Sequence, residues 1–362
     1  MQDLQKQLDD ALQTIAIVEK ILPPEHPNLA AYYNNIAFTY KAMDDLPNSL
    51  DYILKAIAIR EKTLPPEHPK LADTYYDAAT IYQVMNDLQK SLDYELKAIA
   101  IREKILPPQH LNLATAYDSI AYTYEAMGDV QKSLDYALKA IAIAEKTLPP
   151  DHPNLAAYYN NIAFTYKTMD DLPNSLDYIL KAIAIREKTL PPEHPDLAGT
   201  YYDAATIYQA MNDLQKSLDF GLKTMAIFEK TLPPEHPSLA ASYNNIADTY
   251  EAMGDYPKSL DFGLKALAIV EKILPPEHPN LAISYHNIAT TYHKLSKWEQ
   301  ALSFEQKALQ IWLKALPFGH PHTQTAVNSM AIILPDAMKE KGKKWAEPYQ
   351  KWFEENCGAY LK

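Results

Sequence analysis

A six-residue segment, Leu-Pro-Pro-Glu-His-Pro, begins at Leu22 and returns, intact or lightly altered, every 42 residues. Its further copies begin at Leu64, Leu106, Leu148, Leu190, Leu232, Leu274 and Leu316. Self-similarity at a fixed period of this size indicates a solenoid, in which each unit buries its apolar face against its neighbours. The chain is therefore expected to be one repeated unit stacked into a continuous array.

The apolar residues within one unit have helical spacing. They recur three and four positions apart from Tyr33 to Tyr40, and again from Leu50 to Ile57 after a short break. Each unit is therefore predicted to hold two amphipathic helices of roughly 15 residues, about 23 Å long. The fold class that follows is all-α, built from antiparallel helix pairs.

The segments between the helices carry recognisable turn and cap residues. The tight turn inside successive units begins with Asp44, Asn86, Gly128, Asp170, Asn212, Gly254 or Ser296. All but the serine tolerate a left-handed backbone. An aspartate that follows in six units, Asp45 in the first, is predicted to cap the second helix, and the Pro-Pro pair to end it.

The chain divides into three parts. Residues 1–27 are predicted to form a lone helix, the second helix of an incomplete repeat, which is compatible with an internally started part of a longer protein. Residues 28–319 hold seven units of 42 residues, and residues 320–362 hold a degenerate eighth unit and a C-terminal cap helix. Pro335 is expected to break the eighth unit. The aromatic residues from Trp345 to Phe353 are expected in the cap, with a partner-binding surface as the alternative.

Composition excludes several classes of protein. A formal charge of −12 and a pI near 5.4 argue against nucleic acid as a partner, because neutralising phosphates requires clustered Lys and Arg. No apolar stretch reaches the roughly 20 residues that membrane insertion needs. The single cysteine, Cys357, excludes an internal disulfide, and the first 20 residues do not resemble a signal peptide. A cytoplasmic location is predicted.

No motif for catalysis, cofactor binding or metal binding is apparent. Eight of the eleven histidines stand at equivalent places, from His26 to His320. Equivalent residues of adjacent helical hairpins lie about 10 Å or more apart, whereas zinc requires nitrogens at about 2.0–2.1 Å. We expect these histidines to help start the following helices. No nucleophile with a base, phosphate loop or nucleotide fingerprint is present, so a non-catalytic protein without a cofactor is predicted.

The unit resembles a tetratricopeptide repeat. The residues that carry the resemblance are Tyr33-Asn34-Asn35-Ile36-Ala37, Tyr40, Ser49-Leu50 and Lys55-Ala56-Ile57. The 42-residue spacing is similar to that of the kinesin light chain type. The chain departs from the pattern where a large residue is expected in the second helix, which varies through Ile53, Glu95, Ala137, Gly221 and Gly263. The coiled coil of true light chains is absent, so a motor subunit is not expected.

The resemblance implies a right-handed superhelix whose concave groove is lined by the first helix of each unit. It places peptide-binding positions at Asn34, Asn35, Phe38, Lys41, Tyr76, Asp77, Asp118, Ser119, Tyr122, Glu125, Asn160, Asn161, Phe164, Lys167, Tyr202, Asp203, Asn244, Asn245, Asp248, Glu251, His286 and Asn287. The implied function is a scaffold for protein–protein interaction that binds extended peptide segments.

The chemistry of these positions leaves two interpretations. The amides of Asn35, Asn161, Asn245 and Asn287 could pair with the backbone of any extended peptide, and the aromatic residues could form anchoring pockets. Alternatively, the asparagines bond neighbouring helices and the aromatic residues belong to the core. A clamp that binds the C-terminal carboxylate of a peptide is rejected, because it requires Lys or Arg one helical turn before the asparagine, and no unit has a basic residue there. Acidic residues outnumber lysines along the groove, which favours a neutral or basic ligand.

A larger period is superimposed on the first. Residues 28–69 and 154–195 differ only at Ala42 and Thr168, and the next two units also match their partners 126 residues on. The groove is consequently expected to present similar chemistry twice. Near identity also permits self-association between slipped units. The alternatives to a peptide scaffold are a structural or self-assembling array, or the sensor region of a larger multidomain protein.

Overall fold

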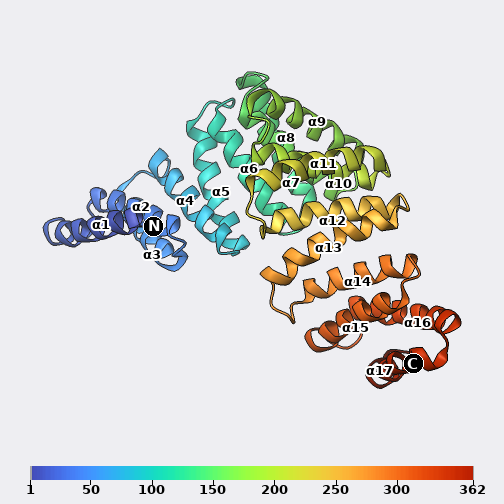
Figure 1. Ribbon diagram of the computed structural model, residues 1–362. Helices are drawn as coiled ribbons and strands as arrows, with labels where there is room; N and C mark the ends of the chain where they lie inside the picture. Colours follow the sequence, from blue (N-terminus) through green and yellow to red (C-terminus); the bar gives the residue numbers. More distant parts are fainter. Residues whose placement is uncertain (1, 362) are drawn as a thin grey trace. The chain divides into compact units, whose positions relative to one another are not determined.

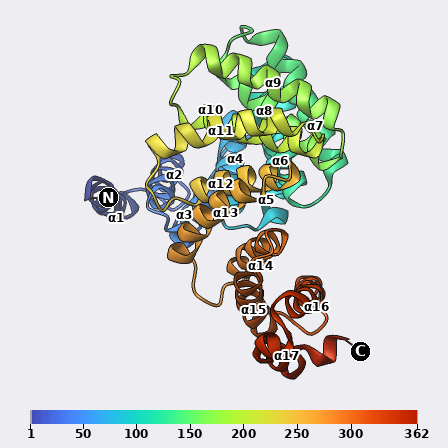
Figure 2. The same cartoon turned by 45° about the vertical axis from the view of Figure 1, so that its right-hand side comes forward.

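The computed structural model describes residues 2–361, and these residues form seventeen α-helices and one short 3₁₀ helix, η1 (Gly358–Leu361) (Figure 1). No strand occurs within this range, so the predicted all-α class is confirmed. The helices divide into two compact halves, an N-terminal half (Met1–Thr189) and a C-terminal half (Leu190–Lys362). Within each half, antiparallel helix pairs follow one another along the chain (Figure 2).

Each unit contains a first and a second helix, as the periodicity predicts. The first helices are α2 (Pro27–Ala42), α4 (Pro69–Val84), α6 (Leu111–Ala126), α8 (Pro153–Thr168), α10 (Pro195–Ala210), α12 (Pro237–Ala252), α14 (Pro279–Lys294) and α16 (Pro321–Lys341). The second helices are α3 (Leu46–Thr63), α5 (Leu88–Ile105), α7 (Val130–Thr147), α9 (Leu172–Thr189), α11 (Leu214–Thr231), α13 (Tyr256–Ile273) and α15 (Trp298–Ala315). Two further helices, α1 (Gln2–Ile21) and α17 (Lys343–Cys357), stand at the ends of the chain.

The turn between the two helices of a unit is left-handed at its first residue in all seven units, with φ between 55° and 83°. Ser296 adopts this conformation too, at φ 55°, so the prediction that set the serine apart was wrong. The packing of α14 on α15 holds the serine there despite its intrinsic preference. Asp45 and its counterparts on α5, α7, α11 and α13 accept a backbone N–H at N3 of the second helix, which confirms the predicted caps.

The repeated histidines cap the first helices. In every copy Nδ1 accepts the backbone N–H two residues on, at 3.1–3.2 Å. The histidines concerned are His26, His68, His110, His152, His194, His236, His278 and His320. Every first helix except α6 has a proline at its first position. The missing N–H of proline is harmless at that position, because it would have no partner within the helix. This geometry confirms the role expected for these residues.

Small buried residues let the helices approach closely. Ala37 and Ala56 are fully buried, and the buried hydroxyl of Ser49 donates to the Ala37 carbonyl oxygen at 2.8 Å. A hydrogen bond also joins a second helix to the next first helix at several places: the hydroxyl of Tyr33 on α2 donates to Glu19 on α1 at 2.7 Å. The same pair recurs at Tyr75–Glu61, Tyr117–Glu103, Tyr159–Glu145, Tyr243–Glu229 and Tyr285–Glu271.

The C-terminal end differs from the prediction in one respect. Helix α16 continues through Pro335 to Lys341, so the expected break at the proline was wrong. Ile333, Leu334 and Ala337 are buried on both sides of the proline, and their packing offsets the lost backbone hydrogen bond. Helix α17 then packs on α16 as a cap and buries its Phe353.

The left-handed turn generates a stability prediction. Glycine occupies positive φ without the steric cost that serine bears, so Ser296→Gly is expected to raise the unfolding free energy by about 0.5 kcal/mol. The matched change Gly128→Ser is expected to lower it by about 1 kcal/mol. Urea unfolding followed by circular dichroism measures both. A change of the unfolding free energy in the same direction for both variants would contradict the backbone explanation.

Candidate peptide-binding surface on the first helices

The structure places all 22 predicted groove residues on first helices, from α2 to α14. Seven of them are exposed: Asn35, Phe38, Tyr122, Asn161, Phe164, Asp248 and Asn287. Asn245 is buried, and the others are partly buried. Consecutive first helices also touch one another, α6 with α8 and α10 with α12. In each half, the exposed residues of this set and their partly buried neighbours form a surface that we call the first-helix face.

Several predicted residues bond a neighbouring first helix. Nζ of Lys41 donates to the Thr80 hydroxyl at 2.7 Å, and the amide of Asn34 donates to Asp77 at 3.3 Å. His286 is likewise engaged internally, since its Nδ1 lies 2.8 Å from Oε1 of the buried Glu305. The hydrogen bonds of Lys41 and Asn34 join neighbouring units and the His286 contact joins α14 to α15, so part of the predicted site has a structural role.

The four asparagines do not form a uniform ladder. The amide nitrogen of Asn161 donates to both carboxylate oxygens of Asp118, at 3.0 and 3.2 Å. Asn245 donates to Gln209 and is 6% exposed, with its Oδ1 unpaired against α11, where the absence of a side chain at Gly221 permits the close approach. Asn161 and Asn245 thus bond residues of a neighbouring first helix, and Asn161 is exposed like Asn35 and Asn287.

Three aromatic residues project from the first-helix face instead of entering the core. Phe38 is 46% exposed, Tyr122 58% and Phe164 52%. Tyr76 and Tyr202 are partly buried, and the guanidinium of Arg102 lies 4.9 Å from the ring centre of Tyr76. Exposed aromatic side chains on one face are typical anchors for binding, because they offer large apolar area at a small entropic cost.

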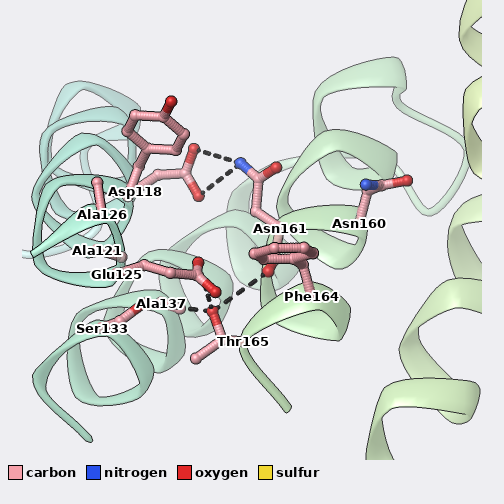
Figure 3. A pocket seen from close by; sticks show the side chains of 11 residues that line it. Asp118, Ala121, Glu125, Ala126, Ser133, Ala137, Asn160, Asn161, Phe164 and Thr165 are labelled. Carbon is pink, nitrogen blue, oxygen red and sulfur yellow. Dashed lines mark hydrogen bonds between the residues drawn. The ribbon is translucent and has the colours of Figure 1, made fainter. Parts of the chain in front are cut away.

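Two of these aromatic residues border a cavity of about 520 Å³ between α6, α7 and α8 (Figure 3). We call it the α6–α8 cavity. Its lining residues are Asp118, Ala121, Tyr122, Glu125, Ala126, Ser133, Ala137, Asn160, Asn161, Phe164 and Thr165. A second cavity, of about 280 Å³, shares Asp118, Tyr122 and Asn161 with it and extends to Tyr76 on α4.

The cavity depends on one small residue in a second helix. Ala137 stands where α3 and α9 have the buried Ile53 and Ile179. Replacing a large side chain by alanine leaves space unless the helices close upon it. The sequence contained this signal, but the prediction did not include Ala121, Ala126, Ser133, Ala137 or Thr165 as site residues.

Two carboxylates lie in the α6–α8 cavity without a basic residue beside them. Burial raises the pKa of Asp118 to about 6, although the hydrogen bond from Asn161 opposes the shift. Burial likewise raises the pKa of Glu125, which accepts hydrogen bonds from Thr165 at 3.2 Å and Thr168 at 3.3 Å. No lysine or arginine is among the lining residues. Figure 3 shows both carboxylates on the same side of the cavity, facing α8.

The equivalent place 126 residues on has a different character. There Asn244, Asp248 and Gly263 replace Asp118, Tyr122 and Ala137, and Thr290 replaces Phe164. The cavity lined by Asn244, Asp248 and Gly263 holds only about 20 Å³, with Ile288 within 3.6 Å of the place where a Gly263 side chain would begin. The expectation that similar chemistry appears twice is wrong at this position, because the aromatic walls are absent.

A scan against family models matches the tetratricopeptide repeat at residues 28–104, 112–188, 154–230, 196–272 and 238–314. The chain belongs to the tetratricopeptide repeat family. Among solved structures it is similar to nearly identical TPR-like repeats assigned to a kinesin light chain of Podosopora anserina. That match has 28% identity and a TM-score of 0.51, over 58% of this chain and 98% of that chain. The resemblance to the kinesin light chain type is thereby confirmed.

Two more distant structures share the repeat fold. BtubC (BKLC) of P. vanneervenii is 15% identical, with a TM-score of 0.51 over 68% of this chain and 93% of that one. A signal-transduction ATPase with a tetratricopeptide repeat sensor, from Pyrococcus horikoshii, is 14% identical, with a TM-score of 0.64 over 98% of this chain and 55% of that one. A search of curated proteins finds no match.

Residues 2–361 lack two structural features. No helix in this range is both long enough and apolar enough to cross a bilayer. Within the same range, no three His, Cys, Asp or Glu side chains are grouped so that they could hold a metal ion.

The raised pKa of Asp118 predicts a pH-dependent stability. The native state binds this proton more tightly than the unfolded chain, whose aspartate pKa is near 3.8, so stability falls as pH rises from about 4 to 6. Asp118→Asn removes that loss. Relative to the wild-type chain, the variant is expected to gain about 2 kcal/mol of unfolding free energy between pH 4 and pH 7.5. Urea unfolding at both pH values measures the difference, and a pH-independent effect would refute the buried-carboxylate explanation.

Proposed function

We propose that this protein is a non-catalytic scaffold that binds extended peptide segments along the first-helix face. The observation that carries the proposal is the α6–α8 cavity, about 520 Å³ in volume and bordered by the exposed Tyr122 and Phe164. A cavity of this size that combines aromatic walls with polar side chains is typical of a ligand site. Membership of the tetratricopeptide repeat family supports a role in protein interaction. We place this role in the cytoplasm.

The charges favour a neutral or basic peptide. Asp118 and Glu125 face the α6–α8 cavity, and Asp248 and Glu251 line the smaller cavity 126 residues on, where they stand at the positions of Tyr122 and Glu125. The ammonium group of Lys41, on the same face, is already hydrogen-bonded to Thr80. An acidic peptide would place like charges together in partly buried surroundings, which is unfavourable.

A structural, self-assembling array is the second candidate. It is favoured by the near identity of residues 28–69 and 154–195, since two interchangeable units could pair with copies from another chain. Concentration-dependent association without any peptide, measured by sedimentation velocity, would support this candidate.

A peptide selection followed by site-directed crosslinking tests the scaffold. Random twelve-residue peptides on phage are selected against the full chain, and enriched peptides are synthesised. A photo-reactive benzoylphenylalanine is placed at Phe38 or Phe164 on first helices, and as matched controls at Leu138 or Leu180, which are exposed on second helices. Crosslinks are expected from the first pair and not from the second. Failure to enrich any peptide, or stronger crosslinking from the second helices, would overturn the proposal.

A further inference from the structure

We propose that the α6–α8 cavity is a specificity pocket for the side chain of an arginine in the bound peptide. The inference rests on the proposed function, because the arginine has to be presented by a peptide lying along the first-helix face. Beyond the proposed function, it specifies that the peptide carries an arginine and that this arginine enters the α6–α8 cavity.

The carboxylates retain capacity for a ligand. Both oxygens of Asp118 accept from a single amide nitrogen of Asn161, and each oxygen has a second lone pair. Glu125 accepts only long hydrogen bonds, 3.2 Å from Thr165 and 3.3 Å from Thr168. All of these donors are neutral. A cation entering the cavity would therefore meet two carboxylates whose negative charge is not compensated locally.

The walls and floor suit a planar cation on a carbon stem. Tyr122 and Phe164 offer exposed aromatic faces at the border of the cavity, and a guanidinium group stacks on such faces. Ala121 and Ala137 line the interior and can contact the methylene groups of the stem. Arginine combines these features, with a planar head and an apolar stem.

Other side chains fit less well. An apolar side chain would cover Asp118 and Glu125 without pairing their charge, which costs free energy in proportion to their burial. Lysine brings the charge, but its ammonium is more strongly hydrated and cannot stack or bond a carboxylate through two parallel donors. Glutamate would add a third negative charge. Arginine is therefore expected to be preferred over each of them.

The duplication inside the chain supplies a natural comparison. The place lined by Asn244, Asp248 and Gly263 is formed by α12, α13 and α14, which are equivalent to α6, α7 and α8, but its cavity holds only about 20 Å³. Asp118, Tyr122, Ala137 and Phe164 correspond there to Asn244, Asp248, Gly263 and Thr290. The second place therefore lacks both aromatic walls and the carboxylate at the position of Asp118, although Asp248 brings a carboxylate to the position of Tyr122. The array is therefore expected to hold one such arginine pocket between α6 and α8, and none between α12 and α14.

The test uses the peptides enriched on the full chain and a double variant, Asp118→Asn and Phe164→Thr. Each replacement already occurs at the equivalent position of this chain, which favours a folded variant, and circular dichroism checks this. Arginine is expected at one fixed position in most enriched peptides. Fluorescence anisotropy is expected to show about tenfold weaker binding when that arginine becomes lysine, and about 30-fold weaker binding when it becomes the neutral citrulline.

The controls separate this inference from the proposed function. The double variant is expected to lose most of the discrimination between arginine and citrulline, whereas Asp135→Asn, which removes an exposed carboxylate from α7, is expected to keep it. If peptides are enriched and crosslink to first helices but carry no fixed arginine, the scaffold holds and the pocket assignment fails. Equal binding of the arginine and citrulline peptides also overturns the assignment. If no peptide is enriched, both fail.

Discussion

The interface between one helix pair and the next is the contact on which the rest of this protein depends. A lone helical hairpin leaves one side of its second helix uncovered, and the following first helix covers it. The 42-residue period repeats this interface with the same side chains, which is why the hydrogen bond from Tyr33 to Glu19 recurs as Tyr75 to Glu61 and onward. Inside a pair, small residues such as Ala37 and Ser49 let the two helices approach closely.

A fixed interface also determines where the chain can vary. Side chains on the first-helix face that do not join two units can change without disrupting the packing between units. Tyr122 and Asp248, for example, occupy the same repeat position, and one is aromatic whereas the other is acidic. The burial of Asp118 and Glu125 lowers stability at neutral pH, because water is partly replaced by protein around an ionised group. Buried carboxylates that lower the stability in this way are common at functional sites.

Local signals accounted for most of the fold. The helical spacing, the turn residues and the histidine before each first helix predict elements that the structure contains, because each depends on neighbours within a few residues. Ser296 and Pro335 were predicted wrongly because packing overrode a local preference. The hydrogen bond from Asn161 to Asp118 and the size of the α6–α8 cavity were not predicted, although six of the eleven residues that line the cavity were among the predicted site residues. Both depend on the distance between helices from different units, which a single sequence does not specify.

The central claim is that peptide ligands bind the first-helix face with an arginine between Tyr122 and Phe164. A crystal structure of the full chain with an enriched peptide tests it most directly. The account predicts an extended peptide along the first helices, with a guanidinium group within hydrogen-bonding distance of Asp118 and Glu125 and stacked on at least one of the two rings. A peptide lying on the second helices, or an α6–α8 cavity left without a side chain of the peptide, would contradict it.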